Sequence, residues 1–169
     1  AHALGVIHRD IKPANVLVDW PTDLVKVTDF GMAKAGDAFR SRTGIMVGTP
    51  GYMAPEQLAE SALTPACDLY ALGVLAFELL TARLPHPAAS LGELLRLVAN
   101  QPAPDVRTFR RDVPAGIAHV VADLLERRPE RRPQGAVVLA DRLASLRGSL
   151  HTDTDGSSPR HGDGPMSRP

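Results

Sequence analysis

The sequence predicts a mainly α-helical domain that carries one small β-hairpin near its N-terminus. Apolar residues repeat at helical spacing in three segments of the second half, and residues 67–80 are apolar almost all round, as expected for a helix buried at the centre of a domain. Two short β-branched runs, residues 16–18 and 24–27, enclose a turn with proline and aspartate, which is typical of a hairpin. We therefore expect helices to form the core and the hairpin to link two polar loops.

The overall composition is that of an ordinary globular protein. The chain has 169 residues, 44% of them hydrophobic and 22% charged, which is enough for one domain with a sizeable core. Its formal net charge is zero, so the charge balance favours neither nucleic acid nor an anionic membrane as a partner. The single cysteine, Cys67, excludes an internal disulfide and fits a reducing compartment. No apolar run reaches the ~20 residues of a membrane span. We expect a cytoplasmic chain without a membrane segment. The sequence does not decide whether a longer parent protein is anchored in a membrane.

The first third of the chain alternates short elements with turns. Residues 1–5 read as the end of a helix that Gly5 stops. Trp20 lies in the hairpin turn, where a partly exposed residue is a better expectation than a binding aromatic. A short helix is predicted to start near Pro55, because proline is favoured at the first position of a helix.

The helical half has recognisable boundaries. Ser90 followed by Glu93 is a capping-box pattern and predicts the start of one amphipathic helix. The last amphipathic helix is predicted to end at Gly148. Residues 148–169 consist mainly of glycine, proline, serine and charged residues, so we predict a disordered tail that buries too little apolar surface to fold.

One polar loop, residues 8–15, places three different functional groups close together. Asp10 supplies a carboxylate that can accept a proton from a hydroxyl, Lys12 supplies a cation, and Asn15 supplies an amide oxygen. This set suits phosphoryl transfer, in which the protein mainly positions two reactants and neutralises charge on phosphate oxygens.

A second carboxylate, Asp29, follows the hairpin and is a candidate partner of Asn15 for one cation. Mg²⁺ prefers few carboxylates together with waters and substrate phosphates, so these two ligands would suffice only with a nucleotide bound. Taken alone, an aspartate before a turn glycine is more often structural. Because Asp29 occurs together with the polar loop at residues 8–15, we favour a metal-binding role for it over a structural one.

The run from Asp68 to Gly73 resembles the bacterial branch of eukaryotic-type protein kinases, and three motifs in a fixed order resemble those of the same family. They are His8-Arg9-Asp10 with Lys12 and Asn15, then Asp29-Phe30-Gly31, then Ala54-Pro55-Glu56. They are similar to the catalytic loop, the metal-binding motif and the end of the activation segment. The resemblance implies a protein-kinase-like C-terminal lobe over residues 1–147, with the catalytic loop at 8–15 and the activation segment at 29–56.

The resemblance also implies roles for individual residues. Lys12, together with Gly48-Thr49 and Tyr52, is similar to serine/threonine-specific members. Asp10 would be the base toward a Ser or Thr hydroxyl of a protein substrate, and Lys12 would contact the transferred phosphate of ATP. Asn15 and Asp29 would hold Mg²⁺, with Mn²⁺ as an alternative. Thr49 would hydrogen-bond Asp10 and Lys12 and shape the substrate site.

The segment between the second and third motifs is implied to be regulatory. Arg9 would pair with a phosphate added to Thr43, or in second place to Ser41. A doubly charged phosphate opposite an arginine can order a loop through charge-assisted hydrogen bonds. A plain loop threonine at position 43 is the alternative.

Three charged residues are expected to hold the structure rather than to react. The resemblance implies a buried ion pair between Glu56 and Arg132 that pins the end of the activation segment to the helices. Asp68 lies in the segment predicted to be most buried, and a buried carboxylate must be paired. We therefore expect Asp68 to accept hydrogen bonds from the backbone of the catalytic loop.

Some features of a complete kinase are not found in this sequence. No glycine-rich loop, strand lysine or helix glutamate of an N-terminal lobe precedes the catalytic loop. We therefore expect a C-terminal lobe without its N-lobe, inactive until that lobe is supplied. A catalytically silent kinase-like binding module is the alternative, although a silent module would not need four intact site residues. Residues 84–87 replace the Pro-Phe anchor of many relatives, which leaves the packing of that loop open.

Overall fold

The computed structural model describes residues 1–30 and 50–154, with side chains up to residue 148. Its helices and strands, in chain order, are β1 (Val16–Asp19), β2 (Leu24–Val27), α1 (Pro55–Leu58), α2 (Ala66–Thr81), α3 (Leu91–Asn100), α4 (Ala115–Leu124) and α5 (Ala136–Thr154). Short 3₁₀ turns occupy His2–Leu4, Pro13–Asn15, Pro50–Tyr52, Val106–Thr108 and Pro129–Arg131. The prediction of a mainly helical domain with one hairpin is confirmed.

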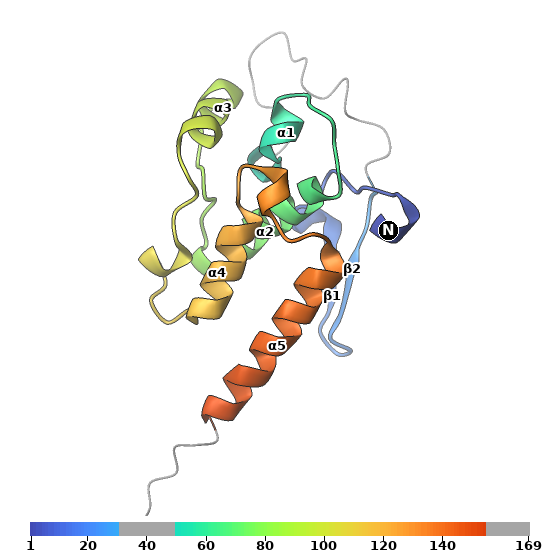
Figure 1. The fold of residues 1–169 in the computed structure, drawn as a ribbon, viewed down its shortest axis with the longest axis vertical. Helices are drawn as coiled ribbons and strands as arrows, with labels where there is room; N and C mark the ends of the chain where they lie inside the picture. Colours follow the sequence, from blue (N-terminus) through green and yellow to red (C-terminus); the bar gives the residue numbers. More distant parts are fainter. Residues whose placement is uncertain (31–49, 155–169) are drawn as a thin grey trace, which may run out of the picture.

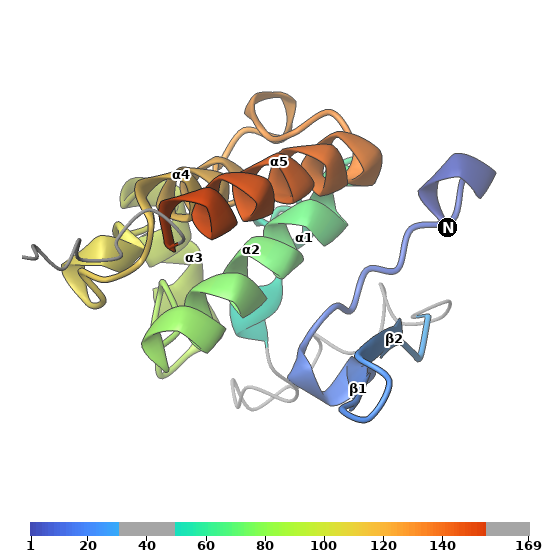
Figure 2. The ribbon, with the colours of Figure 1, turned by 90° about the horizontal axis from the view of Figure 1, so that it is seen from below.

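Helix α2 is the centre of the molecule. Most of its residues are buried, from Cys67 in the first turn to Phe77 one turn before its end, as predicted for a segment that is apolar almost all round. Figure 2 shows α4 and α5 on one side of α2 and the β1–β2 hairpin on the other. A central helix with neighbours on several faces has no polar side, and the sequence pattern follows from that position.

Helices α2 and α4 approach each other closely at Gly73. A Cβ atom added to Gly73 would lie 2.7 Å from Leu124 Cβ and 3.3 Å from the Leu124 carbonyl carbon. Real Cβ atoms do not approach other atoms so closely, so only glycine lets the two helices pack here. Leu124 and Val120 form a second small core with Leu69 of α2 and Leu139 of α5.

The hairpin lies outside this core. Strands β1 and β2 are antiparallel, with Val16 opposite Val27 and Asp19 opposite Leu24. All residues of β2 are exposed, and in β1 only Val16 is partly buried. Trp20 in the turn is 79% exposed, which confirms the expectation that it is a surface residue.

The start of α3 matches its predicted cap, and the N-terminal segment matches its predicted stop. The Ser90 hydroxyl accepts a hydrogen bond from Glu93 N at 3.2 Å, and Glu93 Oε2 accepts one from Ala89 N at 2.9 Å. The first helical turn ends at Gly5, whose φ of 72° is left-handed, a conformation that glycine adopts without strain.

Helix α5 is longer than the sequence predicts. It continues through Gly148 to Thr154, so the predicted helix end at 148 is wrong and the predicted tail does not begin there. An isolated glycine costs about 1 kcal/mol in a helix and does not by itself end one. The next proline is Pro159, so no residue before it forbids helical backbone. Figure 1 shows α5 extending away from the rest of the helices.

The loop after α2 is well packed although it departs from the Pro-Phe pattern. Leu84 packs against the main core, and its Cδ1 would lie 2.9 Å from a Cβ at Gly51. His86 is buried, and its Nε2 donates to Gln101 O at 3.2 Å. Burial lowers the pKa of His86 below its ordinary value. His86 is therefore neutral and contributes to the packing of this loop.

None of the helices in the described part of the chain combines the length and apolar content that crossing a bilayer requires.

Candidate active site

The predicted catalytic loop, residues 8–15, brings Lys12 and Asn15 into direct contact with Asp10. Lys12 Nζ lies 2.9 Å from Asp10 Oδ2, and Asn15 Nδ2 donates to the same oxygen at 3.0 Å. Asn15 Nδ2 also donates to the backbone carbonyl of Asp10 at 2.8 Å. Asn15 is buried, whereas the Asp10 side chain is 43% exposed. The carboxylate is thus held in place by two neighbours and still open to a substrate.

His8 closes the loop onto the end of β2. Its Nε2 lies 2.8 Å from the carbonyl oxygen of Thr28, which can only accept, so this nitrogen carries the proton. The other ring nitrogen, Nδ1, accepts from Asp10 N at 3.2 Å. The His8 ring also contacts the Phe30 ring, with centroids 4.7 Å apart. Neutral His8 therefore joins the loop to the segment that follows the hairpin.

Asp68 of α2 fixes the backbone of the loop, as expected. Its Oδ2 accepts from His8 N and its Oδ1 from Arg9 N, both at 2.8 Å. Arg9 has a φ of 68°, which is unfavourable for a residue with a Cβ atom. Two hydrogen bonds to a buried carboxylate stabilise this strained backbone immediately before Asp10.

His2 is a site residue that the sequence analysis did not find. Its Nε2 lies 2.8 Å from Asp68 Oδ2, so the N-terminal turn contacts the carboxylate that holds the catalytic loop. Its other ring nitrogen, Nδ1, is buried without a hydrogen-bond partner. The two residues are 66 positions apart and no local motif connects them, so only the fold shows the contact.

Two side chains have oxygens that fit a divalent cation. Both hydrogen bonds that the Asn15 side chain forms with the described residues use Nδ2, so within that part of the chain its Oδ1 is available to a cation. Asp29 is exposed and has a left-handed φ of 57° directly after the hairpin. An amide oxygen with one carboxylate is a donor set that Mg²⁺ accepts when nucleotide phosphates complete it. Among residues 1–30 and 50–148, His, Cys, Asp and Glu side chains form no cluster of three that could hold a metal by themselves.

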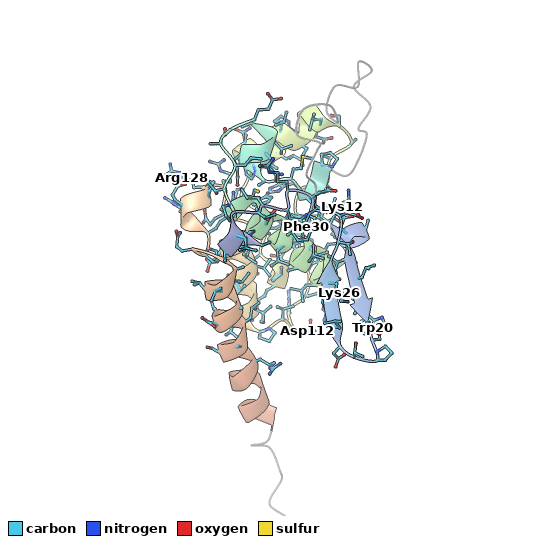
Figure 3. The ribbon with its side chains drawn as sticks, turned by 90° about the vertical axis from the view of Figure 1, so that its right-hand side faces the viewer. Lys12, Trp20, Lys26, Phe30, Asp112 and Arg128 are labelled. Carbon is cyan, nitrogen blue, oxygen red and sulfur yellow. The ribbon has the colours of Figure 1, made fainter. Side chains whose placement is uncertain are left out.

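Figure 3 shows where these groups lie on the hairpin. Lys12 and Phe30 lie at the end of the hairpin next to the helices, and Trp20 lies at the opposite end. The candidate chemistry is therefore confined to the junction between the hairpin and the helical body.

The expected ion pair between Glu56 and Arg132 is present and fully enclosed. Arg132 Nη1 lies 2.6 Å from Glu56 Oε1, and Nη2 lies 2.9 Å from Oε2. The remaining guanidinium N–H groups donate to the carbonyls of Glu126, Ala66 and Arg127. All five donors of the arginine are thus used, and its guanidinium carbon lies 4.9 Å from the centre of the Tyr70 ring. The pair connects α1 to the start of α2 and to the turn before α5.

Three neighbouring titratable groups have raised pKa values. Burial raises the pKa of the Cys67 thiol to about 12, with smaller contributions from Asp68 and Glu56. Burial also raises the pKa of Tyr70 to about 12. Tyr52 is buried too and donates to Glu78, and both effects raise its pKa. These residues stay protonated at physiological pH and serve packing.

Three predicted site residues, Ser41, Thr43 and Thr49, lie outside the described residues. Arg9, the implied partner of a phosphate on Thr43 or Ser41, has an exposed side chain. The catalytic and regulatory roles of these four residues stay predictions.

A comparison with protein families matches residues 1–143 to the protein kinase domain. The chain is 45% identical over 139 residues to the serine/threonine-protein kinase Pkn1 of Myxococcus xanthus, covering 78% of this chain and 20% of Pkn1. It is 36% identical over 151 residues to the probable serine/threonine-protein kinase pknA2 of Bifidobacterium longum, covering 89% and 20%. It is 34% identical over 164 residues to the serine/threonine-protein kinase PknA of Mycobacterium tuberculosis, covering 96% and 37%.

The chain belongs to the protein kinase family. The predicted resemblance to bacterial serine/threonine kinases is confirmed by these relatives. The chain spans between a fifth and just over a third of the length of these curated relatives. The match therefore concerns one part of such proteins.

Proposed function

We propose that this chain is the catalytic-loop lobe of a serine/threonine protein kinase that transfers the γ-phosphate of ATP to hydroxyls of protein substrates. The observation that carries the proposal is the contact of one exposed carboxylate, Asp10, with Lys12 at 2.9 Å and with Asn15 at 3.0 Å. Base, cation and amide thus converge on one point, as phosphoryl transfer requires. The relatives named as serine/threonine kinases support the choice of acceptor.

In this proposal each side chain has one task. The exposed oxygen of Asp10 accepts the proton of the Ser or Thr hydroxyl, while the hydroxyl oxygen forms its bond to the γ-phosphorus and ADP leaves. Lys12, next to Asp10, neutralises charge that develops on the transferred phosphate. Asn15 and Asp29 would hold Mg²⁺, or Mn²⁺ in its place, and the cation would screen the phosphate oxygens.

The hairpin gives a place for the N-terminal lobe of such an enzyme. Large apolar residues are exposed along both strands and in the turn between them. They include Leu17 at 57%, Trp20 at 79% and Val25 at 59%. We propose that an upstream lobe covers part of this surface and supplies the contacts to the adenine and the phosphates. Because ATP is the phosphate donor, we place the reaction in the cytoplasm.

The regulatory part of the proposal concerns Arg9 and the activation segment. The Arg9 side chain is exposed while its backbone is fixed by Asp68. A phosphate on Thr43, or on Ser41, could pair with this exposed guanidinium group, whose backbone is fixed. We also propose that Thr49 hydrogen-bonds the catalytic pair, as the family resemblance implies.

The test uses the chain joined to the coding sequence that precedes it, purified and supplied with ATP, Mg²⁺ and a basic Ser/Thr peptide. Asp10→Asn keeps the shape of the side chain and removes the base, so kcat should fall by about 10²- to 10⁴-fold. Asp23→Asn, in the exposed hairpin turn, is the matched control and should keep the wild-type rate.

Two outcomes would contradict the proposal. An Asp10→Asn variant that transfers phosphate as fast as the control would remove Asp10 as the base. A wild-type protein that binds the peptide but never transfers phosphate would favour the alternative, a catalytically silent binding module. The 169-residue chain by itself is expected to show no transfer, because an upstream lobe is needed to hold the nucleotide.

A further inference from the structure

Gln57 connects the end of the activation segment to the catalytic loop. It lies in α1, the short helix that begins at Pro55. Its Oε1 accepts a hydrogen bond from Ala54 N at 3.0 Å, and its Nε2 donates to the backbone carbonyl of Arg9 at 3.0 Å. The second contact joins residues that are 48 positions apart. One amide side chain thus caps its own helix and also holds the loop.

The carbonyl that Gln57 contacts belongs to the peptide between Arg9 and Asp10. On the N-terminal side of Arg9, the backbone N–H is held by Asp68 Oδ1 at 2.8 Å. On the C-terminal side, the carbonyl is held by Gln57. Arg9 itself has a left-handed φ of 68°, so this backbone needs external support to persist. The two contacts, from α2 and from α1, clamp the residue directly before Asp10.

We propose that Gln57 is a positioning residue that sets the orientation of Asp10 by fixing the Arg9–Asp10 peptide. The inference rests on the proposed function, because it gives Asp10 the role of base. The orientation of that base then depends on the position of α1, to which the activation segment leads. A catalytic carboxylate needs closely defined geometry, and small misplacement lowers the rate strongly.

Two substitutions separate this role from simple helix capping. Gln57→Glu keeps an acceptor for Ala54 N but replaces the donor by an oxygen that repels the Arg9 carbonyl. Gln57→Lys keeps a donor for that carbonyl but removes the acceptor for Ala54 N. If Gln57 positions Asp10, the Glu variant loses activity and the Lys variant does not. If Gln57 only caps α1, the order is reversed.

The kinetic experiment uses the protein with its upstream coding sequence, as in the Asp10 test. For Gln57→Glu we expect kcat to fall about tenfold, since an unpaired carbonyl and a displaced base both act on the reacting state. The KM values for ATP and for the peptide should stay within twofold of wild type. Gln57→Lys should keep kcat and lower only the melting temperature. Gln101→Glu, an exposed glutamine of the helical body, controls for the added negative charge.

A second measurement does not depend on catalysis. Amide hydrogen exchange, followed by NMR on the 169-residue chain, reads the two contacts separately. In Gln57→Glu the amides of Arg9 and Asp10 should exchange about tenfold faster, because the loop loosens, while the Ala54 amide stays protected. In Gln57→Lys the Ala54 amide should exchange faster and the loop amides should not.

The outcomes distinguish the inference from the proposed function. If the wild-type protein transfers no phosphate, the proposed function fails, and the exchange data still show whether Gln57 holds the loop. If the wild-type protein transfers phosphate and Gln57→Glu keeps its kcat, the inference alone is overturned. An equal loss of kcat in the Glu and Lys variants would also overturn it, because that result indicates a general loss of α1.

Discussion

The catalytic-loop region, residues 1–30, and the helical body, residues 50–148, are held by different interactions. The body is built on apolar burial around α2, where Val74 and Phe77 are fully enclosed. In the catalytic-loop region the strand residues are mostly exposed. The region is attached through Ile7, which packs against the main core, and through polar contacts, above all those of His2, His8 and Arg9 with Asp68.

This difference indicates how the geometry of the candidate site can be well defined and still change locally. Apolar burial stabilises the body but is not directional. Hydrogen bonds to a buried carboxylate have a defined geometry and can hold a strained backbone. The catalytic loop should therefore be open to local change without unfolding of the body. Three substitutions test this separation, in order of decreasing expected effect.

The largest effect is expected in the body, at Arg132. Arg132→Met would leave the buried Glu56 carboxylate without its partner and would remove five donated hydrogen bonds. Breaking a buried pair in this way costs about 3–5 kcal/mol, and unfolding of the 169-residue chain in urea, followed by circular dichroism, measures the loss.

The matched control for that substitution is Arg128→Met. Arg128 is exposed, and Figure 3 shows its side chain at the edge of the molecule, so its loss should change the free energy of unfolding by no more than about 0.5 kcal/mol. Replacing Glu56 by Leu together with Arg132→Met should recover much of the loss. Equal stability of wild type and Arg132→Met would show that the pair does not support the body.

The second-largest effect is expected at Asp68, where the helical body contacts the catalytic-loop region. Asp68→Asn keeps the size of the side chain and removes its charge. The amide NH₂ of the new side chain would then lie against a backbone N–H of His8 or Arg9, where no hydrogen bond can form. Hydrogen bonds to a charged group contribute about 1.5–3 kcal/mol, and here the loss should fall on the loop. The His8 and Arg9 amides should exchange at least about tenfold faster, whereas the core amides of α4 should change little.

The control for Asp68→Asn is Asp123→Asn. Asp123 forms an exposed pair with Arg142 at 2.5 Å, and such pairs contribute about 0–1 kcal/mol. Faster exchange that spreads uniformly over α2 and α4 in Asp68→Asn would contradict the separation between loop and body.

The smallest effect concerns pH and His86. Burial lowers the pKa of His86 in the folded chain, while the unfolded chain has the ordinary value of roughly 6.5. The unfolded state then binds more protons, so stability decreases as the pH falls below roughly 6.5. His86→Phe removes this contribution, and its stability should fall less than that of wild type between pH 7 and pH 5. Parallel curves for the two proteins, from urea unfolding at each pH, would show that His86 does not titrate on unfolding.

Several parts of the fold and site could be predicted because their signals are local. The hairpin, the start of α3 at Ser90 and the buried character of α2 follow from residue spacing within one segment. The need to pair a buried carboxylate, together with the family resemblance, predicted the backbone contacts of Asp68. The end of α5 could not be predicted, because a single glycine is compatible with either a stop or a continuation.

The contacts of His2 and Gln57 have no local signal. Each joins residues that are about 50 positions or more apart in the sequence, and neither residue type is restricted to such a role. The left-handed backbone of Arg9 is likewise invisible in the sequence, since arginine does not favour it. These features depend on how α1 and α2 are placed against the loop.

The sequence by itself predicted the class of chemistry, because the candidate reactive groups Asp10, Lys12 and Asn15 lie within one short loop. It also determined the family, through the order of three motifs. Only the tertiary structure decided how that loop is held. The supports come from His2, Gln57 and Asp68, and their hydrogen bonds form only when distant segments are packed together.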